Sequence, residues 1–412
     1  MRKDSLYFLS VIVSPVAGII STVLAMRFVE PSDFGYFQLA QLVFLYLAGL
    51  HLGLYSGFAR QYSILRLIGQ DVAENLVTKV GFFSHLIGAF SSIILLGMYI
   101  VERYGENNLN YCLALLISAP TAYFVSRATY YDIVFRVRQD FNVFGKLLII
   151  QNAFLIVSVV FPAFIGYFGL LIRMFVVAIV NYFIRWNVYK IKSDNRMDFN
   201  VGLSLVKIGF PILLGSYFFQ ILFSFDRIII SYSLDTAALG LYAISSQISA
   251  VYLAVVAAIS SYFLPKAISG AGNSIGNVFL YMRKSIIYSV LMLLPMSLCA
   301  YFMIGPFISY FLPTYSNAIS SAEIVALSGV LFAPIVVSFV FVVLNRAYLY
   351  IVIVGLSLFI FFLSARVIPY FFDDITIELI AWMKLVFTAC FSCLLFIIAY
   401  FMVWRGKSEN VC

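Results

Sequence analysis

Charged residues are scarce in this 412-residue chain, at 11% of the sequence, whereas hydrophobic residues make up 63%. A typical soluble domain has about 25% charged and about 45–50% apolar residues. The chain also has no polar stretch long enough to build a sizeable water-soluble domain. The composition therefore excludes an ordinary soluble protein and predicts an all-α polytopic membrane protein, because helices satisfy their backbone hydrogen bonds inside a bilayer.

Residues and motifs typical of enzymes and metalloproteins are also few. The five cysteines give no disulfide framework, and the two histidines, His51 and His85, have no His or Cys beside them at metal-ligand spacing. The G-x-x-x-x-G-K-[ST] loop of ATP-binding proteins is absent. We therefore predict no metal, no cofactor and no direct use of ATP, in a protein that is not an enzyme.

The net charge of +8 does not indicate a nucleic-acid partner. The basic residues lie between apolar segments, as in cytoplasmic loops that face anionic lipid. The partner that this pattern predicts is the lipid bilayer. Because most Lys and Arg fall on one side when the N-terminus is placed inside, both termini are predicted to be cytoplasmic.

Apolar runs of a length that can cross a bilayer as helices dominate the rest of the sequence. Twelve such runs cover residues 5–27, 36–58, 79–101, 110–131, 144–164, 167–189, 204–229, 237–263, 284–304, 322–344, 347–367 and 379–403. The connection 61–78 places several apolar residues near one helical face, which predicts an amphipathic helix on the inner membrane surface. For the connection 267–283, such a helix and an ordinary loop are equally compatible with its glycine-rich sequence.

A weak repeat relates the two halves of the chain. Its matching positions are Pro15…Arg27…Phe34-Gly35-Tyr36 in the first half and Pro211…Arg227…Leu239-Gly240-Leu241-Tyr242 in the second. A repeat offset by six spans keeps the same membrane orientation in both halves. We therefore predict two pseudo-symmetric six-helix bundles, residues 1–195 and 196–412, related by an axis along the membrane normal.

The chain resembles the polysaccharide flippases of the MOP superfamily, the family of O-antigen and exopolysaccharide unit translocases. The resemblance extends over nearly the whole chain, through the two six-span halves and the segments Ala25-Met26-Arg27, Pro31-Ser32-Asp33-Phe34-Gly35-Tyr36-Phe37, Asp226-Arg227-Ile228-Ile229-Ile230 and Leu239-Gly240-Leu241-Tyr242. It implies two bundles around a central cavity. It also implies that an undecaprenyl-pyrophosphate-linked oligosaccharide is moved from the cytoplasmic to the periplasmic leaflet of a bacterial inner membrane by alternating access. Polymerase and chain-length proteins of the same pathway are the protein partners that it suggests.

Basic residues inside the apolar runs are the candidates for binding such a substrate. An unpaired phosphate in a low-dielectric medium is prohibitive, and the planar fork of arginine suits bidentate phosphate bonds. Arg27 and Arg227 occupy related places in the two halves, and we predict that both bind the pyrophosphate. The alternative is that they reach outward to the membrane interface. Arg173 and Lys384 fit the cavity and the interface equally well.

Three further residues are candidates for coupling transport to a proton or sodium gradient. Asp226 could orient Arg227 or carry a coupling cation, and adjacent residues on a helix point about 100° apart. Glu323 opens a span, where the helix dipole alone favours an acid. His51 could titrate near physiological pH, although a packed structural role is the competing interpretation.

Two other classes of protein stay open. A multidrug or small-solute cation antiporter of the same superfamily needs acids in its cavity, whereas the charges inside the spans here are mainly basic. A membrane-embedded glycan polymerase or glycosyltransferase ordinarily needs a sizeable exterior catalytic loop. The longest exterior connections, near 304–321 and 368–378, are short.

Overall fold

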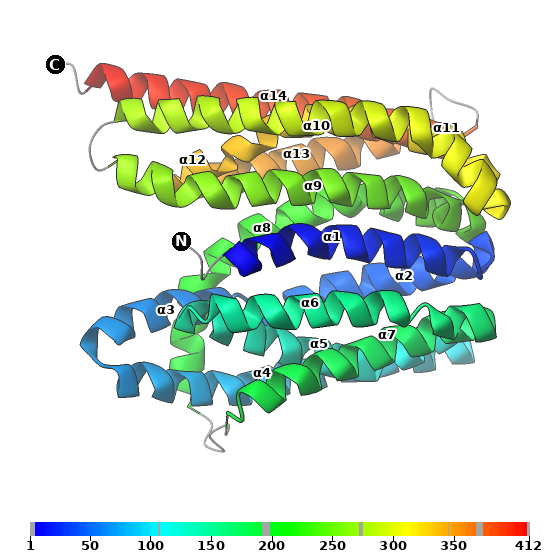
Figure 1. The fold of residues 1–412 in the computed structure, drawn as a ribbon, viewed down its shortest axis with the longest axis horizontal. Helices are drawn as coiled ribbons and strands as arrows, with labels where there is room; N and C mark the ends of the chain where they lie inside the picture. Colours follow the sequence, from blue (N-terminus) through cyan, green and yellow to red (C-terminus); the bar gives the residue numbers. More distant parts are fainter. Residues whose placement is uncertain are drawn as a thin grey trace. The chain divides into compact units, whose positions relative to one another are not determined.

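The computed structural model describes residues 5–105, 108–191, 198–271, 275–344, 346–367 and 374–409, and over these ranges the regular structure is helical (Figure 1). The chain divides into two compact units, Met1–Tyr217 (unit 1) and Phe218–Cys412 (unit 2). The boundary between them falls inside one helix, α8 (Phe199–Ser233). The sequence repeat places its own division at residue 195, before α8, and that division stays a prediction.

Unit 1 is built from the helices that precede α8 and from the first part of α8 itself. The preceding helices are α1 (Ser5–Met26), α2 (Pro31–Leu47), η1 (Ala48–His51), α3 (Leu54–Ile68), α4 (Gln70–Tyr104), α5 (Leu109–Arg138), α6 (Phe141–Val157) and α7 (Val160–Val188). Helix α5 packs against α4 and α7, and α1 packs against α6. The passage α2–η1–α3 is interrupted at Leu52 and Gly53, which both have positive φ.

Unit 2 surrounds a buried helical segment, residues 319–343, that changes from α-helix to 3-10 helix and back to α-helix. Its elements after α8 are α9 (Thr236–Ala271), α10 (Ile275–Phe311), η2 (Pro313–Ala318), α11 (Ile319–Leu327), η3 (Ser328–Val337), α12 (Ser338–Val343), α13 (Ala347–Val367) and α14 (Ile377–Glu409). The η3 segment packs against α9, α10 and α14. At the junction of α11 and η3, the carbonyl oxygen of Ala326 accepts hydrogen bonds from Tyr252 (2.9 Å) and Ser297 (2.5 Å).

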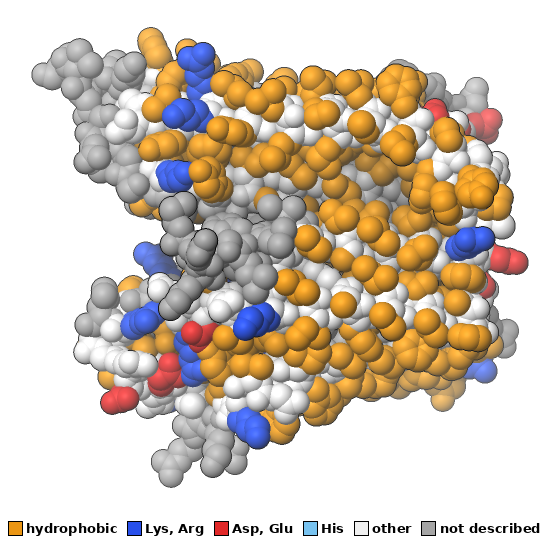
Figure 2. All heavy atoms as spheres, in the orientation of Figure 1, with side chains coloured by type: hydrophobic (Ala, Val, Ile, Leu, Met, Phe, Trp, Pro, Cys, Tyr) orange, Lys and Arg blue, Asp and Glu red, His pale blue; other side chains and the backbone are white. Residues whose placement is uncertain are grey.

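The described helices have the length and composition of membrane spans. Within the described residues, nine are long and apolar enough to cross a membrane, and shorter apolar helices cover Val13–Met26 and Phe141–Val157. On the face in Figure 2, hydrophobic side chains cover the helices along their length, and most charged side chains lie towards the helix ends. The predicted spans lie mostly on helical residues, and α13 has the predicted bounds. Two predicted spans cross a break between helices: 36–58 includes the turn at Leu52 and Gly53, and 144–164 runs past the end of α6 into α7. The prediction of an all-α polytopic membrane protein is confirmed.

The predicted surface helix over residues 61–78 is wrong as a single element. Helix α3 ends at Ile68, Gly69 follows in an extended conformation, and α4 begins at Gln70 and continues to Tyr104. The reason is that Ala73 and Val77 are fully buried in the core of unit 1, so this turn of α4 belongs to the bundle. In the connection 267–283, residues 267–271 end α9 and residues 275–283 begin α10, whereas residues 272–274 lie outside those that the structure describes.

Glycines allow α8 to approach α3 with its backbone in unit 1. A Cβ atom on Gly57 would lie 2.0 Å from the carbonyl oxygen of Leu205, and one on Gly209 would lie 1.9 Å from that of Gly53. Gly53 also has φ +84°, a conformation that other residues adopt rarely. Farther along α8, the Tyr217 hydroxyl donates to the carbonyl oxygen of Tyr46 at 2.8 Å. The first part of α8 is therefore held to unit 1 by direct backbone contact.

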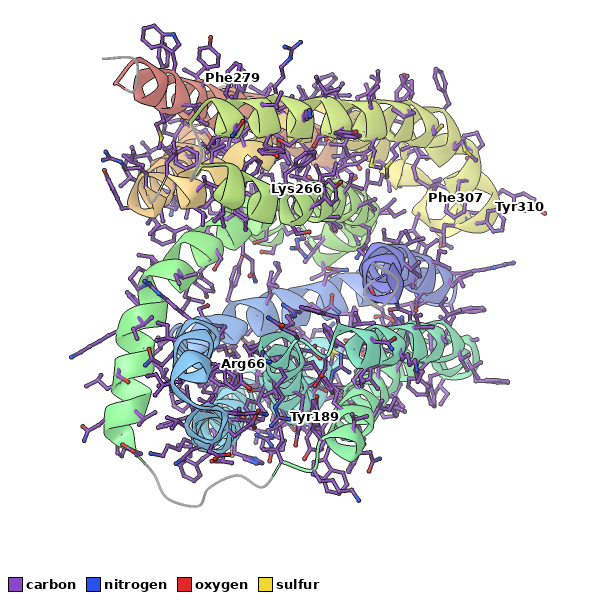
Figure 3. The ribbon with its side chains drawn as sticks, turned by 60° about the vertical axis from the view of Figure 1, so that its left-hand side comes forward. Arg66, Tyr189, Lys266, Phe279, Phe307 and Tyr310 are labelled. Carbon is purple, nitrogen blue, oxygen red and sulfur yellow. The ribbon has the colours of Figure 1, made fainter. Side chains whose placement is uncertain are left out.

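Two hollows of about 550 and 290 Å³ lie near one end of unit 1 and share Glu74, Arg138 and Tyr189. Figure 3 labels Tyr189 and Arg66, which lines the smaller hollow. Glu74 forms an ion pair with Arg138, and the Tyr189 ring is in contact with Phe135 and with the Arg138 guanidinium, each at 4.6 Å. The charges of Glu74 and Arg138 are paired, and the Tyr189 ring has partners. We therefore interpret these contacts as structural, holding α4, α5 and the end of α7 together.

Candidate functional site

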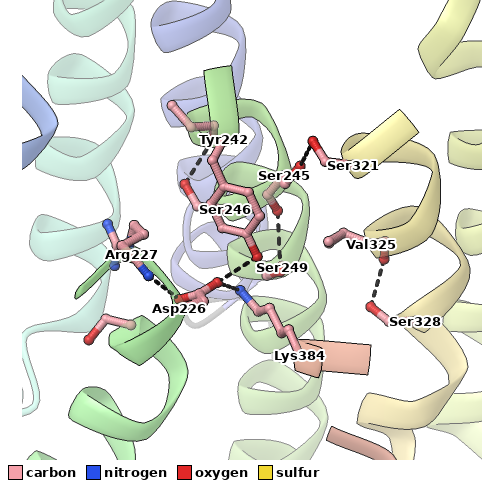
Figure 4. A network of polar contacts seen from close by, with 12 residues as sticks. Asp226, Arg227, Tyr242, Ser245, Ser246, Ser249, Ser321, Val325, Ser328 and Lys384 are labelled. Carbon is pink, nitrogen blue, oxygen red and sulfur yellow. Dashed lines mark hydrogen bonds and ion pairs between the residues drawn. The ribbon is translucent and has the colours of Figure 1, made fainter. Parts of the chain in front are cut away.

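The most deeply buried charges of unit 2 form an ion pair (Figure 4). Asp226 lies on α8 and Lys384 on α14, and they are 1% and 5% exposed. The Lys384 Nζ atom lies 2.5 Å from Asp226 Oδ2. Tyr242, on α9, donates a hydrogen bond to the same oxygen at 2.8 Å, and the backbone N–H of Arg227 donates to Oδ1 at 2.9 Å. Both carboxylate oxygens therefore have partners.

The local sequence forces these charges inward. On α14, Lys384 lies in the middle of a buried stripe at helical spacing, formed by Ile380, Ala381, Thr388 and Phe391. Removing an ion from water costs several kcal/mol even after relaxation, so a lone ammonium at this position would be strongly unfavourable. Asp226 on α8 supplies the opposite charge. We therefore infer that α8 and α14 can pack together here only because the two charges are paired.

Serine hydroxyls extend the network from α9 to α11. Ser245 and Ser249 follow Tyr242 at helical spacing on α9 and are buried. The Ser245 hydroxyl lies 3.2 Å from that of Ser321 on α11, and Ser249 donates to the carbonyl oxygen of Ser245 (Figure 4). The buried polar network of unit 2 thus joins α8, α9, α11 and α14.

Arg227 is half-buried beside the pair but does not neutralise Asp226 through its side chain. Its Nε atom is buried and has no hydrogen-bond partner among the described residues. The sequence left open which group pairs with Asp226, and the structure assigns that place to Lys384. Arg227 therefore keeps donors for another partner.

In unit 1, Arg173 on α7 is buried, at 7% exposure, among neutral partners. Its Nε donates to the Ser158 hydroxyl at 3.1 Å, and its Nη2 donates to that of Ser21 on α1. In the described part of the chain, it makes no ion pair with a carboxylate. The positive charge of Arg173 is therefore solvated by hydroxyls but not neutralised.

The two units place a buried cation on corresponding helices. In unit 1 a cation on the last complete helix, α7, reaches the first helix, α1, and in unit 2 a cation on α14 reaches α8. The partner is Ser21 in the first case and Asp226 in the second. Unit 2 is thus locally neutral at this place, whereas unit 1 keeps a positive charge. The sequence repeat pairs Arg27 with Arg227. It did not suggest that Arg173 and Lys384 occupy related places, although they lie in the sixth and twelfth predicted spans.

The other predicted residues lie apart from this network. Arg27 is exposed, directly after the end of α1 at Met26, and Glu323 is half-buried on α11, where it faces Gly305 of α10. His51 accepts a hydrogen bond from the backbone N–H of Gly53 at 3.1 Å and lines a cavity of about 130 Å³ in unit 1. Among the described residues, no cluster of His, Cys, Asp and Glu could hold a metal ion.

Two buried arginines of unit 1 were expected near cytoplasmic helix ends. Arg127 is 3% exposed and donates to the carbonyl oxygen of Gly81 at 2.8 Å and to the Ser84 hydroxyl. Arg185 forms an ion pair with Asp132 at 2.5 Å. Both arginines lie inside predicted spans, 110–131 and 167–189, and the apolar character of these runs did not indicate that the two side chains are buried.

Just before α8, Asp198 forms a partly exposed ion pair with Lys79 of α4 at 2.8 Å. The hydrogen bond from Lys79 holds the pKa of Asp198 below its usual range. This pair is in contact with water, so it can be compared with the buried pair Asp226–Lys384 of unit 2.

The fold is that of MOP-superfamily transporters. An inward-facing multidrug resistance MATE family transporter matches 97% of this chain and 99% of its own, with a TM-score of 0.75 and 12% identity. An outward-facing structure of a multidrug resistance MATE family transporter matches 98% of this chain and 96% of its own, with a TM-score of 0.70 and 13% identity. A MOP superfamily transporter from Pyrococcus furiosus, for which a binding pocket of reverse polarity is described, covers 98% of this chain and 96% of its own, with a TM-score of 0.72 and 11% identity. The protein is therefore a multi-pass membrane protein with the fold of these transporters.

Residues 23–321 match the family described as polysaccharide biosynthesis protein, and the chain belongs to that family. The resemblance noted from the sequence is thereby confirmed. A search of curated proteins finds no match.

Proposed function

We propose that the protein moves an undecaprenyl-pyrophosphate-linked oligosaccharide from the cytoplasmic to the periplasmic leaflet of a bacterial inner membrane by alternating access. In this proposal both termini are cytoplasmic, and polymerase and chain-length proteins act on the delivered unit. The family supports a role in polysaccharide synthesis, and the fold supports transport. The observation that carries the proposal is the buried Arg173, whose partners are hydroxyls rather than a carboxylate.

An anionic headgroup would complete the surroundings of Arg173. A charge kept inside a bilayer costs at least about 2.5–3.5 kcal/mol, and an approaching phosphate offsets that cost. The guanidinium has five N–H donors, and the hydroxyls of Ser158 and Ser21 use two of them. The remaining donors can form the charge-assisted bonds that phosphate accepts. Arg27, Arg227 and Lys384 are proposed as further contacts along the path of the headgroup.

Coupling to an ion gradient is part of the proposal, with Asp226, Glu323 and His51 as the candidate residues. Glu323 is included because it is half-buried on α11 and forms no ion pair in the described part of the chain. A flipping rate in liposomes that does not change when either the proton or the sodium gradient is collapsed would remove ion coupling.

A cation antiporter is the competing function, and the paired acids do not favour it. Organic cations need carboxylates that are not already neutralised. Asp226 is paired with Lys384, and Asp132 is paired with Arg185. Among the described residues, the fully buried charges without an ion pair, Arg127 and Arg173, have the sign that suits an anion.

Deletion of the gene in a glycan-producing bacterium tests the function. We expect lipid-linked oligosaccharide units to accumulate on the cytoplasmic face, where an impermeant glycan-modifying enzyme reaches them only in inverted vesicles. Single-unit surface glycan without chains would indicate a polymerase instead. Unchanged glycan together with increased sensitivity to cationic dyes would indicate an antiporter.

Replacing Arg173 by glutamine should lower the rate of flipping by about 10–100-fold, since a hydrogen bond to a charged group contributes about 1.5–3 kcal/mol. The rate is measured with a fluorescent lipid-linked oligosaccharide in proteoliposomes. Arg103→Gln, at an exposed position on α4, is the matched control and should leave the rate unchanged. Because no carboxylate depends on Arg173, the melting temperature should not fall. Wild-type flipping by a well-folded Arg173→Gln protein would contradict the proposed role.

A further inference from the structure

We propose that Lys384 is a tethered counter-cation. Its ammonium group occupies a monovalent-cation site built by Asp226 and Tyr242, so that Asp226 binds no free alkali cation in the native protein. This inference concerns the pair itself and does not depend on the identity of the transported substrate. Of the two coupling ions proposed above, it leaves Asp226 the proton only.

The geometry around the ammonium is that of a cation site contributed by three helices. Asp226 of α8 provides a carboxylate oxygen 2.5 Å from Nζ. Tyr242 of α9 provides an aromatic ring whose centroid lies 5.8 Å from Nζ, within the range of cation–π attraction. The Tyr242 hydroxyl donates to the same carboxylate oxygen and so helps to hold it in place. The cation comes from α14 as part of the chain.

Because the Asp226 carboxylate is buried, it requires a cation beside it. Asp226, Tyr242 and Lys384 are 1%, 0% and 5% exposed. The charged and titratable groups that face Asp226 are Lys384, Tyr242 and the adjacent Arg227. Since the Arg227 side chain does not hydrogen-bond to the carboxylate, Lys384 is the group that neutralises it directly.

Tethering gives the ammonium a large advantage over a free ion. A group linked to its site binds intramolecularly, at an effective concentration set by the tether rather than by the solution. A free sodium or potassium ion would have to displace a buried ammonium that the fold of α14 already aims at Asp226. The native site should therefore not respond to the alkali cation present.

Removing the ammonium while leaving its space should open the site to a free cation. Lys384→Ala removes the amine and the side-chain stem, which leaves room for an ion beside Asp226. Lys384→Met also removes the charge, but it fills the space with an unbranched apolar chain. These two variants form a matched pair that separates loss of charge from gain of an empty cation site.

The test is thermal unfolding of the purified full chain in nanodiscs, with choline chloride replaced by sodium, potassium or lithium chloride at constant ionic strength and pH. A ligand that binds only the folded state raises the melting temperature as its concentration increases. We expect a saturable rise of at least about 2 °C for Lys384→Ala in one of the alkali salts. The wild type, Lys384→Met and the double variant Asp226→Asn/Lys384→Ala should show no such rise.

Two results would overturn the inference. One is a wild-type melting temperature that rises with an alkali cation and loses this response in Asp226→Asn, because the native site would then be open. The other is a Lys384→Ala protein that does not respond to any alkali cation, or that cannot be recovered folded in any alkali salt although Lys384→Met can. If neither variant folds, the wild-type measurement decides. No glycan takes part, so failure here leaves the proposed flipping function untouched.

Discussion

Replacing Asp226 by leucine should lower the free energy of unfolding by about 3–5 kcal/mol, because it leaves the buried ammonium of Lys384 without a counter-charge. It also removes the acceptor of the Tyr242 hydroxyl. Unfolding is followed by thermal denaturation of the purified protein in detergent. The loss is expected to be among the largest for any single substitution that keeps the volume of the side chain similar.

The double variant Asp226→Leu/Lys384→Met distinguishes the effect of losing one charge from the effect of losing both charges. Replacing a buried ion pair by apolar residues of similar volume is often neutral or stabilising, so the double variant should regain most of the lost stability. Asp198→Leu is the control, because the side chains of its ion pair with Lys79 are 35% and 25% exposed, and it should cost much less than Asp226→Leu. Equal losses in the single and double variants would show that the charges of Asp226 and Lys384 are not coupled.

Substituting alanine for Gly57 should prevent most of the protein from folding. The added Cβ would lie 2.0 Å from the carbonyl oxygen of Leu205, and both clashing groups are backbone, so α3 or α8 must move. Overpacking typically costs about 1–3 kcal/mol, and a clash between backbones exceeds that range because no rotamer relieves it. The measurement is the yield and melting temperature of monodisperse protein by size-exclusion chromatography.

Gly97→Ala is the matched control for this clash. It lies on α4, and a Cβ there meets no atom within 4 Å. Since alanine favours a helix interior by about 1 kcal/mol over glycine, this variant should be as stable as the wild type or more stable. Normal yield of Gly57→Ala would mean that the close approach of α3 and α8 is not required for folding.

These two predictions concern the same helix. Helix α8 carries the glycine contact in its unit 1 part and Asp226 in its unit 2 part. Pro211 lies inside the helix between them, where the missing N–H weakens the backbone ladder. Helix α8 is therefore one covalent element whose ends are secured by different means, a backbone contact at Gly57 and a charge pair at Asp226.

The positions of most long apolar helices were predictable from the sequence. Spans depend on the length and hydrophobicity of local runs, and the predicted range 347–367 agrees with α13 although only two residues separate it from the preceding span. The family was also predictable, from short segments around Arg27 and Asp226. The helix over 61–78 was wrong as a single element, because the amphipathic pattern continues across the break at Gly69 and does not reveal it.

The candidate site was predictable in its membership but not in its pairing. Asp226, Arg227 and Lys384 were singled out because charges in apolar runs need an explanation. Which of them pair could not be read from spacing, since the partner of Asp226 lies 158 residues away. The adjacent Arg227 was the natural candidate, but neighbouring residues on a helix point in different directions.

The sequence by itself determined that this protein is a helical membrane protein of the polysaccharide biosynthesis family, because hydrophobic length and short motifs are local properties. The tertiary structure alone decided which charges are neutralised. Packing of α14 against α8 gives Lys384 a carboxylate, whereas packing of α7 against α1 gives Arg173 a hydroxyl. The physical reason is that the cost of a buried charge depends on the groups that the fold brings beside it.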